Sequence, residues 1–214
     1  MPAVRVSFLI LSFLLLPGVV AAQAKADQTS AVVPAESLEY GIKLHDHADP
    51  ALVKWAHGFI EKNFRWKQPN LDYMLDEVDR TFALYNGRTR DAVTYLLVYL
   101  AYRDQIDLAE NFTQHLHDNA LEAETIQHEL QLWQNYNIQP SAADGQPPGM
   151  RNADDLAARM AARLQALETE TVLRSNQLIE IRQRVNFTLF VLDEAYRFMK
   201  SVPPATLQGV RPGE

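Results

Sequence analysis

No proline or glycine occurs between Asp154 and Lys200, and this stretch of 47 residues constrains the fold more than any other feature. Proline breaks the interior of a helix, and glycine weakens it. A run this long without either residue is typical of a long helix. At 1.5 Å per residue, such a helix would extend over roughly 70 Å.

Apolar residues recur along this stretch at the first and fourth positions of a seven-residue repeat. Ten of these thirteen positions are apolar, whereas the whole chain is 47% hydrophobic. The pattern is typical of a coiled-coil seam that packs against another helix. The first positions are Ala157, Leu164, Thr171, Leu178, Val185, Leu192 and Met199, and the fourth positions are Met160, Leu167, Arg174, Ile181, Thr188 and Ala195.

The apolar pattern is interrupted at Thr171 and Arg174. An arginine inside a seam destabilises it unless the charge is paired. This layer therefore indicates a bend, a layer that sets the register, or a hairpin turn at Ser175-Asn176. Because no glycine or proline marks such a turn, we predict one continuous helix.

Residues 49–139 show the periodicity of a helical bundle. Asp49-Pro50 is a typical helix start, in which an N-cap acid precedes proline at the first helical position. Residues 92–102 are apolar on most faces, so their helix is expected at the centre of the bundle. A later helical stretch carries Ile126, Leu130 and Trp133, and we expect a break before it at Asp118-Asn119.

The segments around these helices are expected to be irregular. Residues 25–48 are predicted to form a flexible, extended lead-in, because the apolar side chains from Leu38 to Leu44 alternate with period two. Residues 140–152 contain Asp144-Gly145 and Pro147-Pro148-Gly149, which are typical of a linker. Pro203-Pro204 ends the last helix, so residues 202–214 are predicted to be a disordered tail.

These observations predict an all-α protein. An N-terminal helical bundle of residues 49–139 precedes a long, coiled-coil-like C-terminal helix over residues 153–201, with the linker between them.

The first 24 residues resemble a secretory signal peptide. A positive start with Arg5 is followed by apolar residues 6–16, the break at Pro17-Gly18, and the small residues 21–26. The apolar run is shorter than the roughly 20 residues of a membrane-spanning helix. We therefore expect cleavage and no stable membrane span afterwards. Because the chain has no cysteine, we expect a bacterial periplasmic or secreted protein.

The charge of the chain argues against nucleic acid as a partner. The formal charge is −7, and removal of Arg5 with residues 1–24 makes it −8. An acidic surface repels phosphate backbones, and no basic stripe compensates for it.

A metal site is one alternative function. His57 and Glu61 are four residues apart on a predicted helix, as are Glu124 and His128, so each pair shares a face. If two such faces met inside a bundle, imidazole and carboxylate groups could bind a metal ion. No other cofactor is expected.

An enzyme is not the leading expectation. The sequence contains no nucleophile elbow, phosphate-binding glycine loop or dinucleotide fingerprint. A hydrolase of envelope polymers would need one buried acid, for which Glu36, Glu61 and Glu77 are available. No catalytic residue is selected by the pattern.

The leading expectation is a non-enzymatic exported protein that acts through protein–protein contacts, as an accessory component of an envelope or secretion assembly. Residues 154–200 would self-associate or bind a protein partner through the apolar seam. Trp66, between Arg65 and Lys67, is the best candidate for an exposed aromatic contact. The predicted contact residues are Met160, Leu164, Leu167, Leu178, Ile181, Val185, Leu192 and Trp66.

Overall fold

A computed structural model of the chain describes residues 35–137 and 150–213. The described residues are all-α, as predicted, with no strand among them. Their elements are α2 (Ala35–His47), α3 (Pro50–Phe64), α4 (Leu71–Thr81), α5 (Gly87–Asn137), α6 (Met150–Met199) and the 3-10 helix η2 (Pro204–Leu207). The predicted signal peptide lies outside the described residues, as does most of the predicted linker.

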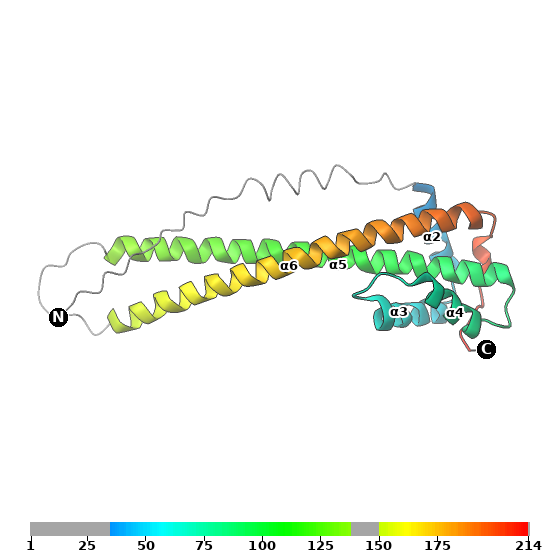
Figure 1. The fold of residues 1–214 in the computed structure, drawn as a ribbon, viewed down its shortest axis with the longest axis horizontal. Helices are drawn as coiled ribbons and strands as arrows, with labels where there is room; N and C mark the ends of the chain where they lie inside the picture. The colour runs from blue at the N-terminus through cyan, green and yellow to red at the C-terminus, as the bar shows by residue number, and fades with distance from the viewer. Residues whose placement is uncertain (1–34, 138–149, 214) are drawn as a thin grey trace, which may run out of the picture.

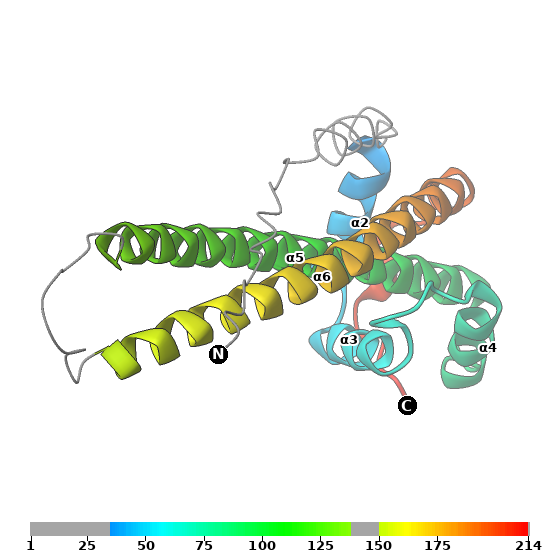
Figure 2. The ribbon, with the colours of Figure 1, turned by 60° about the vertical axis from the view of Figure 1, so that its left-hand side comes forward.

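The long helices α5 and α6 run antiparallel and cross, forming a hairpin that dominates the shape (Figure 1). The shorter elements gather at one end of this hairpin, and the second view shows the same arrangement (Figure 2). We call this end the base; it contains α2, α3, α4, η2, residues 87–104 of α5 and residues 189–213. The arm is the rest of the hairpin, residues 105–137 and 150–188.

The predicted long C-terminal helix is confirmed as one continuous element of 50 residues, without a turn at Ser175-Asn176. The break expected at Asp118-Asn119 is wrong, because α5 continues through it for 51 residues. The N-terminal bundle therefore does not enclose all of residues 49–139. Instead, the second half of α5 projects from the base and pairs with α6.

The sequence of α5 contains a seam that matches the one on α6. Buried or half-buried residues alternate at spacings of four and three along its arm portion, as they do in coiled coils. Seven of these nine residues are apolar. They are Gln105, Ala109, Phe112, Leu116, Asn119, Ala123, Ile126, Leu130 and Trp133.

A polar layer separates the packing of the base from that of the arm. The buried hydroxyl of Thr188 lies 3.0 Å from Gln105 Oε1 and donates a hydrogen bond across the hairpin. On the arm side, Phe112, Leu178 and Ile181 form a small buried cluster. A polar pair at this depth fixes how the two helices are aligned, because any slip would leave these groups unpaired.

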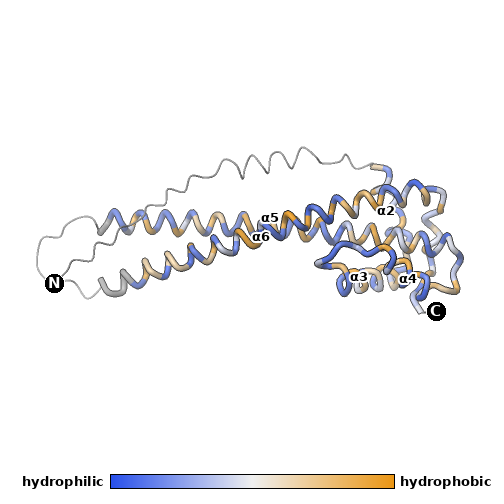
Figure 3. Tube along the Cα trace, in the orientation of Figure 1, coloured by the Kyte–Doolittle hydropathy of each residue, from blue (hydrophilic) through white to orange (hydrophobic). Residues whose placement is uncertain are grey.

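The core of the base draws side chains from every element around it. Hydropathy along the trace shows hydrophobic turns in the base and where α5 and α6 cross (Figure 3). Fully or nearly fully buried members of this core include Leu44 of α2, Ile60 of α3, Val78 of α4, Leu97 of α5, Leu192 of α6 and Leu207 of η2.

The predicted extended lead-in is wrong for residues 35–47, which form α2. Its buried face consists of Ser37, Tyr40, Gly41 and Leu44, which have helical spacing. Two of these residues are small, so the alternation of large apolar side chains concealed the helical period. Gly41 is required there, because a Cβ atom would lie 2.4 Å from Cδ2 of Tyr99.

The predicted disordered tail is also wrong for residues 202–213. The chain turns back at Pro203-Pro204, and Val202, Leu207 and Val210 are buried in the base. The predicted N-cap Asp49 contributes to this docking. Its Oδ1 accepts a hydrogen bond from the Ala51 amide at 2.8 Å, and its Oδ2 lies 3.3 Å from Nε of Arg211.

Candidate functional site

The structure places the predicted contact residues of α6 on the side that faces α5. Leu167, Leu178, Ile181 and Leu192 are at most 4% exposed, and Met160, Leu164 and Val185 are half-buried. Ile181 and Leu178 pack with Phe112 of α5, whereas Leu192 joins the core of the base. The seam is therefore paired within the chain, and our prediction of a seam free for another protein is corrected.

Arg174 is compatible with the seam because its charge has partners. Its guanidinium lies 5.1 Å from the ring centroid of Phe112, and its Nη2 is 3.6 Å from Oε1 of Glu170. The side chain is 34% exposed, so the charge stays in contact with water. The interruption at this layer thus needs neither a turn nor a bend in α6.

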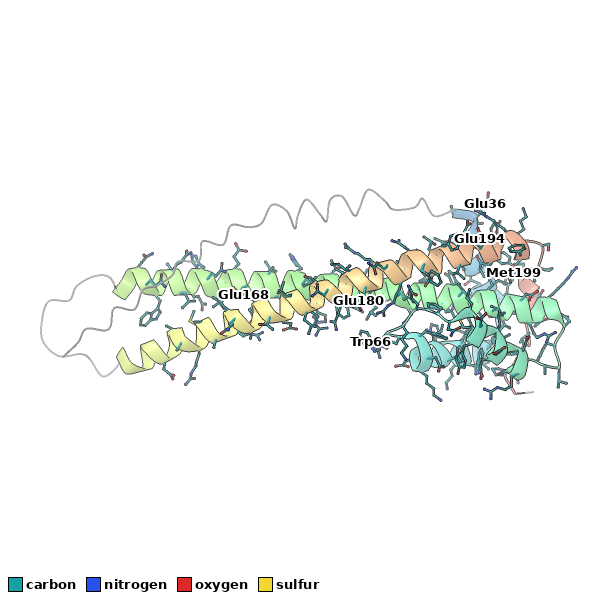
Figure 4. All side chains as sticks on the ribbon, viewed as in Figure 1. Glu36, Trp66, Glu168, Glu180, Glu194 and Met199 are labelled. Carbon is teal, nitrogen blue, oxygen red and sulfur yellow. The ribbon has the colours of Figure 1, made fainter. Side chains whose placement is uncertain are left out.

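Trp66 lies where the base meets the arm (Figure 4). Its ring contacts Phe112 edge-on, with centroids 6.3 Å apart, and the Arg65 guanidinium lies 5.7 Å from the Trp66 centroid. Trp66 remains 53% exposed. The residue therefore links the two regions and still presents an aromatic surface, and its predicted contact with another protein stays a prediction.

The four predicted metal ligands do not come together. Burial raises the pKa of Asp104, and His57 and Glu61 exert smaller electrostatic effects on it, so both residues lie near Asp104 of α5. Glu124 is 20 residues further along the same continuous helix, roughly 30 Å away. Across residues 35–137 and 150–213, no three histidine, aspartate or glutamate side chains are placed to hold a metal ion.

The glutamates considered as catalytic acids are exposed or paired. Glu36 and Glu61 are exposed, and Glu61 lies 3.4 Å from Nη1 of Arg65. Glu77 is 16% exposed and is in contact with Arg80. None of the three is the buried, unpaired carboxyl group that the hydrolase hypothesis requires.

The outer face of α6 carries apolar side chains that no other described element covers. We define this outer face by Val172, Ile179, Phe187 and Phe190, which are 63%, 56%, 38% and 63% exposed. Their spacing of seven, eight and three residues places them on one side of the helix, away from the seam. This second stripe was not predicted from the sequence, because the heptad pattern marks only the seam.

A groove of about 590 Å³ lies between α3 and α4 in the base. Three nearly parallel rings line it: Trp55 and Phe59 have centroids 5.5 Å apart, and Phe59 and Tyr73 have centroids 5.9 Å apart. The cationic residues Lys54, Lys62 and Arg80 border the rings. We call this the α3/α4 groove. It was not predicted from the sequence, in which these residues show only the pattern of two amphipathic helices.

No helix in the described part of the chain is both long and apolar enough to cross a membrane. No family model matches the sequence, and neither the curated proteins nor the solved structures contain a significant match.

Proposed function

We propose that this chain is an exported, non-enzymatic bacterial protein of the periplasm or the extracellular space that acts by binding another protein. The proposed contact is the outer face of α6, in place of the seam that pairs with α5. Export is inferred from the signal-like residues 1–24 and the absence of cysteine.

The observation that carries the proposal is the exposure of this outer face. Four large apolar side chains, two of them phenylalanines, lie on the water-facing side of a helix whose opposite side is already packed. Large apolar side chains exposed on a soluble protein are usually scattered singly, whereas these four share one side of a helix, as they do at interaction sites. Aromatic side chains are also enriched in the centres of protein interfaces.

The shape of the molecule suits such a role. The hairpin holds the outer face on a long helix that extends from a packed base (Figure 1). A rigid helix presents side chains at fixed spacing. Binding therefore does not require a flexible segment of this chain to become ordered, which would weaken the affinity. The proposed role is therefore that of a contact surface along α6, from the base into the projecting arm, in an envelope or secretion assembly.

Site-specific photocrosslinking in cells of the native host tests the proposal. A photoreactive amino acid at Val172 or Phe190 should give one discrete adduct, whose mass distinguishes a second copy from another protein. The same probe at Thr113, an exposed residue on the other helix of the arm, should not.

Substitution of two residues on the outer face of α6 provides the matched control for the crosslinking experiment. Phe187→Ser together with Phe190→Ser should remove the adduct at Val172 without loss of helicity, since both side chains point to water. Absence of any adduct in the wild-type chain, or an adduct that survives the serine substitutions, would rule out this face as the contact.

A further inference from the structure

The α3/α4 groove is independent of the outer face of α6, and its shape suits a helix better than a small molecule. Small-molecule sites usually enclose most of the ligand. This groove is open: Tyr73 is 43% exposed, and no heavy atom lies within 4 Å of the place where a Cβ on Gly58 would project. An apolar floor between two helices is the usual receptor for the apolar side of a third helix.

The charges around the groove select an acidic occupant. Lys54 and Lys62 line it and have no ion-pair partner among the described residues. Arg80 is in contact with Glu77, the acid that shares the lining. The groove therefore carries an excess of positive charge, in a chain whose overall charge is −7.

The arm portion of α5 has the complementary composition. Residues 104–137 contain seven aspartates and glutamates and neither lysine nor arginine. On the side opposite the seam, Leu121 and Leu132 are 51% and 56% exposed. Asp118 and Glu129 are exposed and flank these leucines at helical spacing. We define the α5 acidic face by Asp118, Leu121, Glu129 and Leu132.

The acidic face does not contact the groove of its own molecule, because all the residues that line the groove belong to α3 and α4. Asp104 of α5 lies near His57 and Glu61, which are on the same helix as the groove residues Lys54 and Lys62. Leu121 is 17 residues beyond Asp104 along the continuous helix α5, which corresponds to roughly 25 Å. Contact between the two surfaces therefore requires a second molecule.

We propose that the α3/α4 groove binds the α5 acidic face of a second copy of the chain. Leu121 and Leu132 would pack on the ring floor, with Asp118 and Glu129 beside Lys54 and Lys62. Each copy has one groove and one acidic face. In a two-fold dimer each groove would meet the acidic face of the other copy, so the pairing would close without an open end.

A charge-exchange experiment with the purified protein tests this pairing by sedimentation velocity at low salt. Lys54→Glu with Lys62→Glu should weaken self-association by about tenfold or more, because both contacts in the dimer then become repulsive. Asp118→Lys with Glu129→Lys should do the same from the other side. All four side chains are exposed, so each variant should keep the helicity of the wild-type protein.

The decisive measurement is a mixture of the two variants. A mixed dimer has a negative groove against a positive face, and a positive groove against a negative face, so association should recover to within about threefold of the wild-type value. Lys67→Glu with Arg88→Glu makes the same charge change at exposed positions outside the groove. This control should change association by less than about twofold.

The proposal is overturned if the wild-type protein stays monomeric at low salt, or if its association survives reversal of Lys54 and Lys62. It is equally overturned if mixing the variants restores nothing. Self-association that instead responds to Phe187→Ser with Phe190→Ser would assign the dimer to the outer face of α6, so the two proposals fail separately.

Discussion

The base and the arm share the helices α5 and α6 but are stabilised to different extents. In the base, α6 packs against α2 as well as α5, and residues such as Leu192 and Leu207 have no exposed surface. In the arm, each helix has one neighbour, and the buried cluster beyond the polar layer contains Phe112, Leu178 and Ile181. A helix with one neighbour must leave most of its circumference in water. Stability is therefore concentrated in the base, whereas the arm provides accessible surface.

The largest expected effect separates the two regions directly. Leu192→Ala in the base should lower the free energy of unfolding by about 3 kcal/mol, because it removes a fully buried side chain and leaves a cavity. Leu164→Ala in the arm should cost about 1 kcal/mol, since Leu164 is half-buried and water can enter. Urea denaturation followed by circular dichroism measures both. Equal losses would contradict the comparison.

Alkaline pH should weaken the base. Burial, with a smaller effect from Tyr196, raises the pKa of Tyr40 to about 12. Burial also raises the pKa of Tyr95. Below the ordinary tyrosine pKa near 10 both states are protonated, so this contribution to stability is fully present. As the pH rises from 10 towards 12, the unfolded chain loses these protons first, and stability should fall.

A denaturation series from pH 9 to 12, with phenolate absorbance recorded in parallel, measures this effect. The control is Tyr40→Phe, which removes the hydroxyl that donates to the carbonyl oxygens of Met199 at 2.9 Å and Val202 at 3.1 Å. This variant should be less stable at neutral pH by about 1 kcal/mol. Its stability should also fall less steeply above pH 10; an unchanged slope would show that Tyr40 is not responsible.

The smallest expected effect concerns an ion pair across the arm. Nε and Nη2 of Arg163 lie 2.7 and 2.8 Å from the two carboxylate oxygens of Glu122, and this contact lowers the pKa of Glu122. Both side chains are close to half exposed, so water and salt screen the attraction. Glu122→Gln should therefore leave the midpoint of urea denaturation unchanged within error at neutral pH. A clear loss, absent from Glu124→Gln, would show that the arm depends on this pair.

Much of the local structure could be predicted from the sequence. The cap at Asp49 and the continuity of α6 follow from residue types and from the absence of proline and glycine. Residues 88–139 also contain no proline or glycine. This absence favours a continuous helix over a break at Asp118-Asn119. That dipeptide disfavours a helix only slightly, whereas packing against α6 stabilises it.

Other features could not be predicted because they depend on distant contacts. Ser37 and Gly41 are small residues without a hydrophobic signal, and they are buried because Tyr95 and Tyr99 of α5 lie against them. The order of residues 202–213 depends on the base, which buries Leu207 and Val210. The α3/α4 groove likewise exists because Tyr73 of α4 is stacked on Phe59 of α3.

The sequence by itself determined the helical class of this protein, the unbroken length of α6 and the side of α6 that is buried. The heptad spacing specifies which side of a helix is apolar, because side chains three and four residues apart share a face. Only the tertiary structure decided that this seam packs against α5 of the same chain. A stripe of leucine and isoleucine fits any complementary helix, and only the folded chain shows which one is near enough to cover it.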